Sequence, residues 1–370
     1  MYKVRIADFE DILKNKESWN ELVHRMRLPS VFCTWEWMSL WWKHYGKPYR
    51  PLVLLISKQD ELKGILPLAS RTMIIEDAVL PVRTIILWSS TDLYPDHLDI
   101  IASQEDAQPC MNAALVFLQN NYTRWDVLYF ACIDEDSTIF RELERVNRSI
   151  NVDLQKVSIS PYIAIEKDYM TEIEDYKKFL GKKARLELKR RGRKLFESFG
   201  IIYLSSNPWD DSMAIEKLFA LHKLRAQRKG IKSTFGGSKL LSFHTEVAET
   251  FSNKGWLRLR FLCKGSEPIA ASYGYEFEGQ WCLYQSGLDP KWESMGIGSV
   301  LRYEAIKEAF QMKLKEFDFL RGAEEYKNTW TNRAREQYDV RVYNETLLGT
   351  FFKGTCRARS SVKRIIQKNG

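Results

Sequence analysis

Two glycines spaced as Gly-x-Gly, Gly296 and Gly298, lie between a predicted strand and a predicted helix. Glycine lets a ligand approach the backbone closely because no Cβ atom blocks it. The first turn of the following helix supplies unpaired N–H groups and the positive end of the helix dipole. With Ile297 and Ser299, the glycines predict a site for a diphosphate such as that of coenzyme A. The alternative is that they only form a turn.

If the bound ligand is an acyl-coenzyme A, the strand before the glycines is placed to take part in acyl transfer. Attack on a thioester requires a deprotonated nucleophile, a donor near the carbonyl and alignment of both substrates. Backbone N–H groups over 284–288 are candidates to stabilise the oxyanion, so we assign Tyr284, Ser286 and Leu288 to the cofactor site. None of the six cysteines has an obvious histidine partner nearby in the sequence. We therefore predict direct attack without a covalent enzyme intermediate.

Asp96 and His97 are the first candidates for the general base. They follow Pro95 in a polar segment at the mouth of a predicted strand, and such loops often carry function. In the alternative interpretation, Asp96 only caps the turn and His97 fills a half-buried strand position.

Five further residues are candidates for substrate binding. His222 and Arg225 are three apart on a predicted helix, where they share a face, and they can bind an anionic group or form surface ion pairs. Asp318 can hold a substrate amine or satisfy backbone donors in a central strand. Lys327 and Trp330 suit a charge-and-stacking contact with phosphate or sugar, or a packed tryptophan covered by a solvated lysine stem.

Two parts of the chain show the same order of predicted elements. In the first, a hairpin over 51–68 and strands at 84–88 and 97–101 precede a helix over 105–120 and a strand at 125–130. In the second, strands at 258–262, 269–273 and 281–284 precede a helix over 299–313 and a strand at 317–320. Both final strands begin with an aromatic residue and aspartate, which indicates a duplicated unit. The order predicts an α+β fold with a mixed sheet, not a doubly wound one.

The helix after the glycines is amphipathic. Apolar residues recur at spacings of three and four, and Ser299 can cap its start. Four polar residues are predicted on the solvent side: Arg302, Lys307, Glu308 and Lys313.

We predict four segments: an N-terminal domain (1–165), a basic helical connector (166–200), a C-terminal domain with the cofactor site (201–345) and a basic tail (346–370). The run 181–196 holds eight basic residues and one acidic residue. It predicts a solvated helix with packed leucines, or an electropositive wall for a phosphorylated substrate or RNA. The tail can rest on an anionic membrane surface or act as a solubilising end.

The bulk composition limits the class of protein. The 370 residues suggest two domains, and the net charge of +8 favours an anionic partner without identifying it. The six cysteines show no metal-ligand spacing, so we expect buried thiols in a reducing compartment and no metal site. We find neither a signal-peptide pattern nor a spanning apolar run, and we expect a cytoplasmic protein.

The assembled motifs resemble the cellulose-biosynthesis (CelD/BcsL-like) acetyltransferases of the GNAT superfamily over nearly the whole chain. The resemblance lies in segments 35–46, 64–68, 96–99, 221–225, 287–296, 317–322 and 326–330. It implies tandem GNAT-like domains and transfer of an acyl group, such as acetyl, from acyl-coenzyme A to a sugar or amine in surface-polysaccharide biosynthesis.

The resemblance leaves two other functions open. Fem-type peptidyl transferases share the architecture and take their acyl group from aminoacyl-tRNA, and the basic run favours them. Exposed aromatic residues, which RNA binders interleave with basic ones, occur only at the ends of that run, which weakens the case for a nucleic acid. The third possibility is a non-catalytic binding protein. One departure is Glu293, where the simple GNAT pattern has Gln or Arg; because a carboxylate beside a diphosphate is unfavourable, we expect Glu293 to point away.

Overall fold

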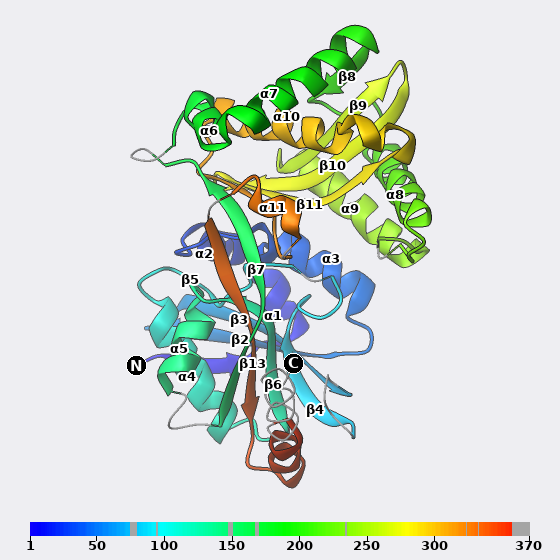
Figure 1. The fold of residues 1–370 in the computed structure, drawn as a ribbon. Coiled ribbons are helices and arrows are strands. Elements are labelled where there is room, and N and C mark those ends of the chain that lie inside the picture. The colour runs from blue at the N-terminus through cyan, green and yellow to red at the C-terminus, as the bar shows by residue number, and fades with distance from the viewer. Residues whose placement is uncertain are drawn as a thin grey trace, which may run out of the picture. The chain divides into compact units, whose positions relative to one another are not determined.

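The apolar runs form strands in two separately packed units (Figure 1). The structure, a computed structural model, describes residues 1–74, 80–93, 95–146, 151–166, 170–233, 235–322, 324–331 and 333–356. Unit 1 contains residues 1–158 and the chain from Arg335 onward, and unit 2 contains Ile159–Ala334. The chain passes into unit 2 within β7 (Val152–Ala164) and returns within β13 (Arg333–Tyr343).

This division differs from the segments expected from sequence. Strand β13 pairs with β6 and so returns the chain to unit 1, a long-range pairing that local patterns do not reveal. The basic run becomes α7 (Gly181–Arg193), which packs against α10 within unit 2 and is not a free connector. Phe352 and Cys356 of the predicted tail are buried in a cluster with Val82 and Tyr343. The basic residues at 357–370 lie outside the described residues.

Unit 1 is a mixed, mostly antiparallel sheet in the order β1-β2-β3-β4-β6-β13-β7, with helices packed on it. Its strands are β1 (Lys3–Ile6), β2 (Arg50–Lys58), β3 (Glu61–Met73), β4 (Val82–Leu87), β5 (Ile101–Ala102, paired with β3), β6 (Val127–Asp134) and the adjoining parts of β7 and β13. Its helices are α1 (Phe9–Lys14), α2 (Lys16–His24), α3 (Trp35–Tyr45), α4 (Ala107–Asn120) and α5 (Thr138–Val146). Four tryptophans, Trp19, Trp37, Trp41 and Trp88, are almost fully buried and anchor its core.

Unit 2 has the order β7-β12-β11-β10-β9-β8. Its strands are β8 (Ile201–Leu204), β9 (Leu257–Lys264), β10 (Glu267–Phe277), β11 (Gln280–Leu288) and β12 (Glu316–Asp318). Its helices are α6 (Ile173–Phe179), α7, α8 (Asp211–Arg228), α9 (Ser238–Asn253), α10 (Ile297–Gln311) and α11 (Glu325–Asn328). Short segments η2 (Lys194–Ser198) and η3 (Pro290–Met295) follow α7 and precede α10. Helices α7 and α10 lie on one face of the sheet, and α8 and α9 on the other (Figure 1).

The predicted repeat is confirmed in its topology. In unit 1 the meander β2-β3-β4 is followed by α4 and then by β6, which runs parallel to β4. In unit 2 the meander β9-β10-β11 is followed by α10 and then by β12, which runs parallel to β11. The α+β fold with a mixed, mostly antiparallel sheet is therefore confirmed.

One predicted strand is largely wrong. Of residues 97–101, only Ile101 is in a strand, because the preceding residues form a loop. His97 has a φ of 57°, which a regular strand does not allow. The Asp99 carboxylate accepts hydrogen bonds from the backbone N–H groups of Thr138 and Ile139. Asp99 therefore anchors this loop to the start of α5.

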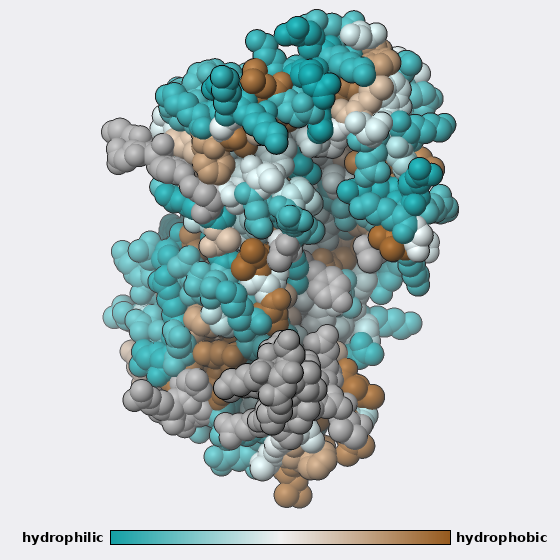
Figure 2. Space-filling model, viewed as in Figure 1, coloured by the Kyte–Doolittle hydropathy of each residue, from teal (hydrophilic) through white to brown (hydrophobic). Residues whose placement is uncertain are grey.

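The surface of α7 is mainly basic. Lys182, Lys183, Lys189 and Arg190 are exposed, and the visible surface at this end of unit 2 is mostly hydrophilic (Figure 2). Leu188 packs into the core as expected, but Leu186 is 54% exposed, which corrects its predicted packing. Among the described helices, none combines the length and apolarity needed to span a membrane.

Candidate active site

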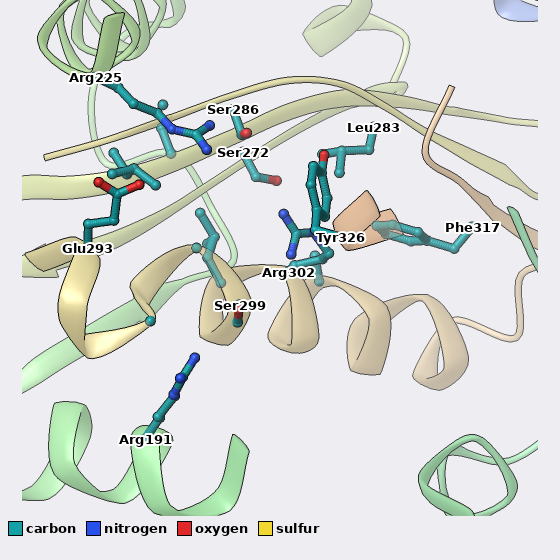
Figure 3. Close-up of a pocket in the computed structure, with 17 residues that line it drawn as sticks. Arg191, Arg225, Ser272, Leu283, Ser286, Glu293, Ser299, Arg302, Phe317 and Tyr326 are labelled. Atoms are coloured by element: carbon teal, nitrogen blue, oxygen red, sulfur yellow. The ribbon is translucent and has the colours of Figure 1, made fainter. Parts of the chain in front are cut away.

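A cavity of about 260 Å³ opens in unit 2 at the start of α10 (Figure 3). Its walls come from β10, β11, η3 and α10, with side chains from α7, α8 and α11. Both glycines of the Gly-x-Gly turn line the cavity, so the turn opens onto a cleft.

The cavity exists because β11 and β12 separate. The two strands pair in register only from Gln280 to Cys282, whereas β11 continues to Leu288. Ser286 donates its N–H to the Gln285 side chain at 2.9 Å, and Asp289 donates its N–H to β10. Because amide direction alternates along an antiparallel strand, the N–H groups of Ser286 and Leu288 point away from β10, toward the open side.

The start of α10 offers two backbone donors. Gly296 has a φ of 72°, in the left-handed region that favours glycine, and links η3 to α10. Its N–H donates to the Glu293 carbonyl, and the N–H of Ser299 donates to the Gly296 carbonyl. Among the described residues, no acceptor bonds to the Ile297 and Gly298 amides, so these two of the four residues predicted to bind the diphosphate keep a free backbone donor.

Arginines supply the positive charge of the cavity. Arg191 of α7, Arg225 of α8 and Arg302 of α10 all line it. Arg191 also pairs with Glu187 at 2.7 Å and covers Gly296. Glu293, expected to point away, also lines the cavity (Figure 3). The three guanidinium groups outnumber this carboxylate, which favours an anionic ligand.

Arg302 lies inside the cavity, although the sequence pattern predicted it on the solvent side. Its guanidinium carbon is 4.4 Å from the ring centroid of Tyr326 and 5.2 Å from that of Trp330. Burial lowers the pKa of Arg302, and burial raises the pKa of Tyr326 while Arg302 opposes that shift. Glu308 was also predicted on the solvent side, yet it forms a largely buried ion pair with Arg260.

The structure separates His222 from Arg225. Arg225 reaches the cavity, whereas the His222 imidazole bonds to the Ser233 hydroxyl, with 2.9 Å between Nδ1 and Oγ. Burial and, second, the charge of Arg225 lower the pKa of His222. The His222 backbone packs against Gly287 and therefore fixes α8 beside β11.

Lys327, Trp330 and Asp318 are all buried, and none of the three lines the cavity. The Lys327 ammonium donates to the carbonyls of Leu320 and Arg321 at 3.1 and 2.6 Å. The lysine side chain is therefore buried, and the alternative of a solvated lysine stem is wrong. Trp330 stacks against Arg302.

Asp318 accepts bonds from the Leu320 N–H at 2.6 Å and from the Ser160 hydroxyl at 3.1 Å. These contacts correspond to the second role predicted for Asp318, in which the carboxylate satisfies backbone donors. They order the chain that leaves β12.

Asp96 and His97 lie in unit 1, whereas every residue lining the cavity belongs to unit 2. Both are buried, and His97 Nδ1 is 2.5 Å from Asp134 Oδ2. Gln337 donates to the other oxygen of Asp134 at 3.1 Å. The sequence did not reveal Asp134 as the partner of His97, and their role as a base stays a prediction.

Several polar side chains of the cavity wall were not assigned to the site from sequence, among them Arg191, Ser272, Arg302 and Tyr326. Arg302 carried a signal, since it is four residues after Gly298 and three before the buried Ala305 and so shares their helical stripe. Arg191 and Ser272 come from other elements, and no local pattern brings them to α10. In the described part of the chain, no cluster of His, Cys, Asp and Glu could hold a metal ion.

Comparison with known proteins agrees with this geometry. Residues 182–328 match the acetyltransferase (GNAT) domain family, which covers the whole cavity. A search of curated proteins found no match. The domain match indicates an acyltransferase enzyme and implies an acyl-coenzyme A co-substrate.

Solved structures show the same fold over most of the chain. FemX has a TM-score of 0.61 at 8% identity, covering 91% of this chain and 96% of its own. A conserved protein of unknown function from Bacteroides thetaiotaomicron scores 0.57 at 9% identity, covering 92% and 100%. The C-terminal domain of a putative lysylphosphatidylglycerol synthetase from Agrobacterium fabrum scores 0.54 at 10% identity, covering 92% and 95%. At these identities the likeness shows the fold alone.

Proposed function

We propose that the protein transfers an acyl group from acyl-coenzyme A to an amine or hydroxyl, with the donor bound in the cavity of unit 2. The observation that carries the proposal is that the Ile297 and Gly298 amides open, at the start of α10, onto a cavity in which Arg191 lies against Gly296. A diphosphate needs fixed N–H donors and a positive charge of this kind.

The gap between β11 and β12 is the place where the thioester of the donor would react. The pantetheine arm would run from α10 into the gap beside β11, where the amides at 286 and 288 face the open side. The Leu288 amide can stabilise the oxyanion that forms when the acceptor attacks the thioester carbonyl, whereas the Ser286 amide would first have to leave the Gln285 side chain. The carbon–sulfur bond then breaks, the thiolate leaves, and the acceptor loses its proton to a base. Asp96, with His97 beside it, is our predicted base.

The acceptor and the cellular role are further proposals. The resemblance to CelD/BcsL-like acetyltransferases supports acetyl transfer to a sugar or amine in surface-polysaccharide biosynthesis. We infer a cytoplasmic protein. The basic residues of the segment 346–370 would allow it to contact the anionic inner face of a membrane.

A second candidate is Fem-type transfer from aminoacyl-tRNA. The exposed basic residues of α7 and the fold shared with FemX favour this alternative. Both functions require an anion at α10, but only the second requires a long RNA contact along α7.

Thermal unfolding with separate ligands distinguishes the two candidates. A ligand at 100 times its Kd stabilises the folded protein by about 2.7 kcal/mol. We expect acetyl-coenzyme A and coenzyme A to raise the melting temperature and a tRNA acceptor-stem RNA to leave it unchanged at physiological salt. A shift with RNA alone would replace the first proposal with the second. A shift with neither would contradict both.

A further inference from the structure

The inner part of the cavity contains polar atoms that have no protein partner. Ser272, on the central strand β10, is only 3% exposed, yet its hydroxyl makes no hydrogen bond within the described structure. The Nε atoms of Arg225 and Arg302 are also buried without a hydrogen-bond partner there. Buried donors without partners are costly, so three around one cavity indicate a ligand group that accepts from them.

Arg302 lacks a counter-ion in the described part of the chain. Its neighbours are the Tyr326 and Trp330 rings and the uncharged Tyr326 hydroxyl, and the charge of Arg225 helps to lower the pKa of Arg302. The one carboxylate of the cavity wall, on Glu293, lies on the Arg225 side of the view, while Leu283 and Phe317 lie on the other side of Arg302 (Figure 3). The Nε atom of Arg302 is buried and the guanidinium stays charged, so an anion from outside the chain would compensate this charge.

In the proposed binding mode, the diphosphate of coenzyme A lies at the start of α10 and leaves Arg302 to another anion. Arg302 lies four residues beyond Gly298, or roughly 6 Å deeper along α10. It adjoins the point where β11 and β12 close, near Leu283 and Phe317. The pantetheine arm that would reach this point is uncharged, so the charge at Arg302 must meet the acyl group or the acceptor.

We propose that Arg302, Arg225 and Ser272 form a second anion subsite, which binds a carboxylate or phosphate carried by the acyl group or by the acceptor. The inference rests on the proposed function, because it places the donor diphosphate at the start of α10. The subsite narrows the substrates to pairs in which the acyl group or the acceptor has an anionic group near the reacting atoms.

The first test compares acyl donors of matched length. Isothermal titration should show succinyl-coenzyme A binding about 10-fold or more tightly than butyryl-coenzyme A if the anion is on the acyl group. Arg302→Met should remove this preference, while Arg302→Lys retains part of it. Both variants should bind free coenzyme A like the wild type, since the diphosphate does not reach Arg302.

The second test covers an anion on the acceptor. Inorganic phosphate should then raise the melting temperature of the coenzyme A-saturated wild type and leave that of the saturated Arg302→Met variant unchanged. Ser272→Ala is the variant that preserves folding, because its hydroxyl has no partner to lose. It should weaken the same response about 3-fold or more.

Three outcomes distinguish a failure of the anion subsite from a failure of the proposed acyl-coenzyme A donor. Equal binding of the two donors together with no phosphate response would overturn the subsite. Equal weakening of free coenzyme A by Arg302→Met would also overturn it, because Arg302 would then belong to the diphosphate site. Phosphate stabilisation that needs Arg302, in a protein that binds no coenzyme A species, would support the subsite and refute the proposed donor.

Discussion

A carboxylate placed at Gly298 should block donor binding without harming the fold. A Cβ atom there would meet only Leu288 Cδ2 at 3.4 Å, an ordinary contact, and Gly298 does not have a positive φ. The first turn of α10 has no acidic residue. An aspartate near a helix start is favourable by about 0.3–1 kcal/mol, so Gly298→Asp should leave the ligand-free protein as stable or slightly more stable.

The expected loss of affinity follows from like-charge repulsion. Two unit charges about 4 Å apart at an effective dielectric constant of about 20 repel by about 4 kcal/mol. Because the cavity is open to solvent, we expect about 2–4 kcal/mol, or roughly 30- to 1000-fold weaker binding of coenzyme A. The matched control is Gly298→Asn, which has nearly the same shape without the charge and should lose much less.

Isothermal titration with coenzyme A on the wild type and both variants measures this difference, and thermal unfolding without ligand confirms the fold. Equal affinities of Gly298→Asp and Gly298→Asn would refute the reasoning, because charge at the start of α10 would then be irrelevant to binding.

Three further variants probe the turn, the base and a buried histidine. Gly296→Ala should destabilise the protein by about 1–2 kcal/mol in urea unfolding, because its φ is 72° and the new Cβ displaces Arg191; an unchanged midpoint would contradict this. Asp96→Asn should lower kcat far more than coenzyme A affinity, and unchanged turnover would remove Asp96 as the base. Burial lowers the pKa of His244 to about 3, so its stabilising effect is complete above pH 6.5 and declines as the pH falls toward 3. Wild type should lose about 2 kcal/mol more than His244→Gln between pH 7 and pH 5, and equal losses would contradict the assignment.

The topology of each unit could be predicted because its signals are local. The hairpin β2-β3 and the meander β9-β10-β11 are apolar runs separated by short polar turns, and α10 follows a Gly-x-Gly turn. The division into units could not be predicted, since it depends on β13 pairing with β6 about two hundred positions earlier in the chain.

The turn and the strand that line the cavity could be predicted from sequence, whereas the packing that brings Arg191 and Ser272 to the cavity could not. Gly298 and Ser286 lie where a strand-turn-helix pattern places them. Arg191 and Ser272 reach the same cavity from other elements, so only tertiary packing brings them there. Arg302 was assigned to solvent because α10 was treated as having one buried face, although it packs against both the sheet and α7.

The structure of the protein with coenzyme A bound tests donor binding at α10 most directly. We predict phosphate oxygens about 3 Å from the amide nitrogens of Ile297 and Gly298, with the pantetheine arm entering the gap beside β11. Coenzyme A bound elsewhere on the chain, with both amides left to solvent, would contradict the assignment of this cavity as the acyl-donor site.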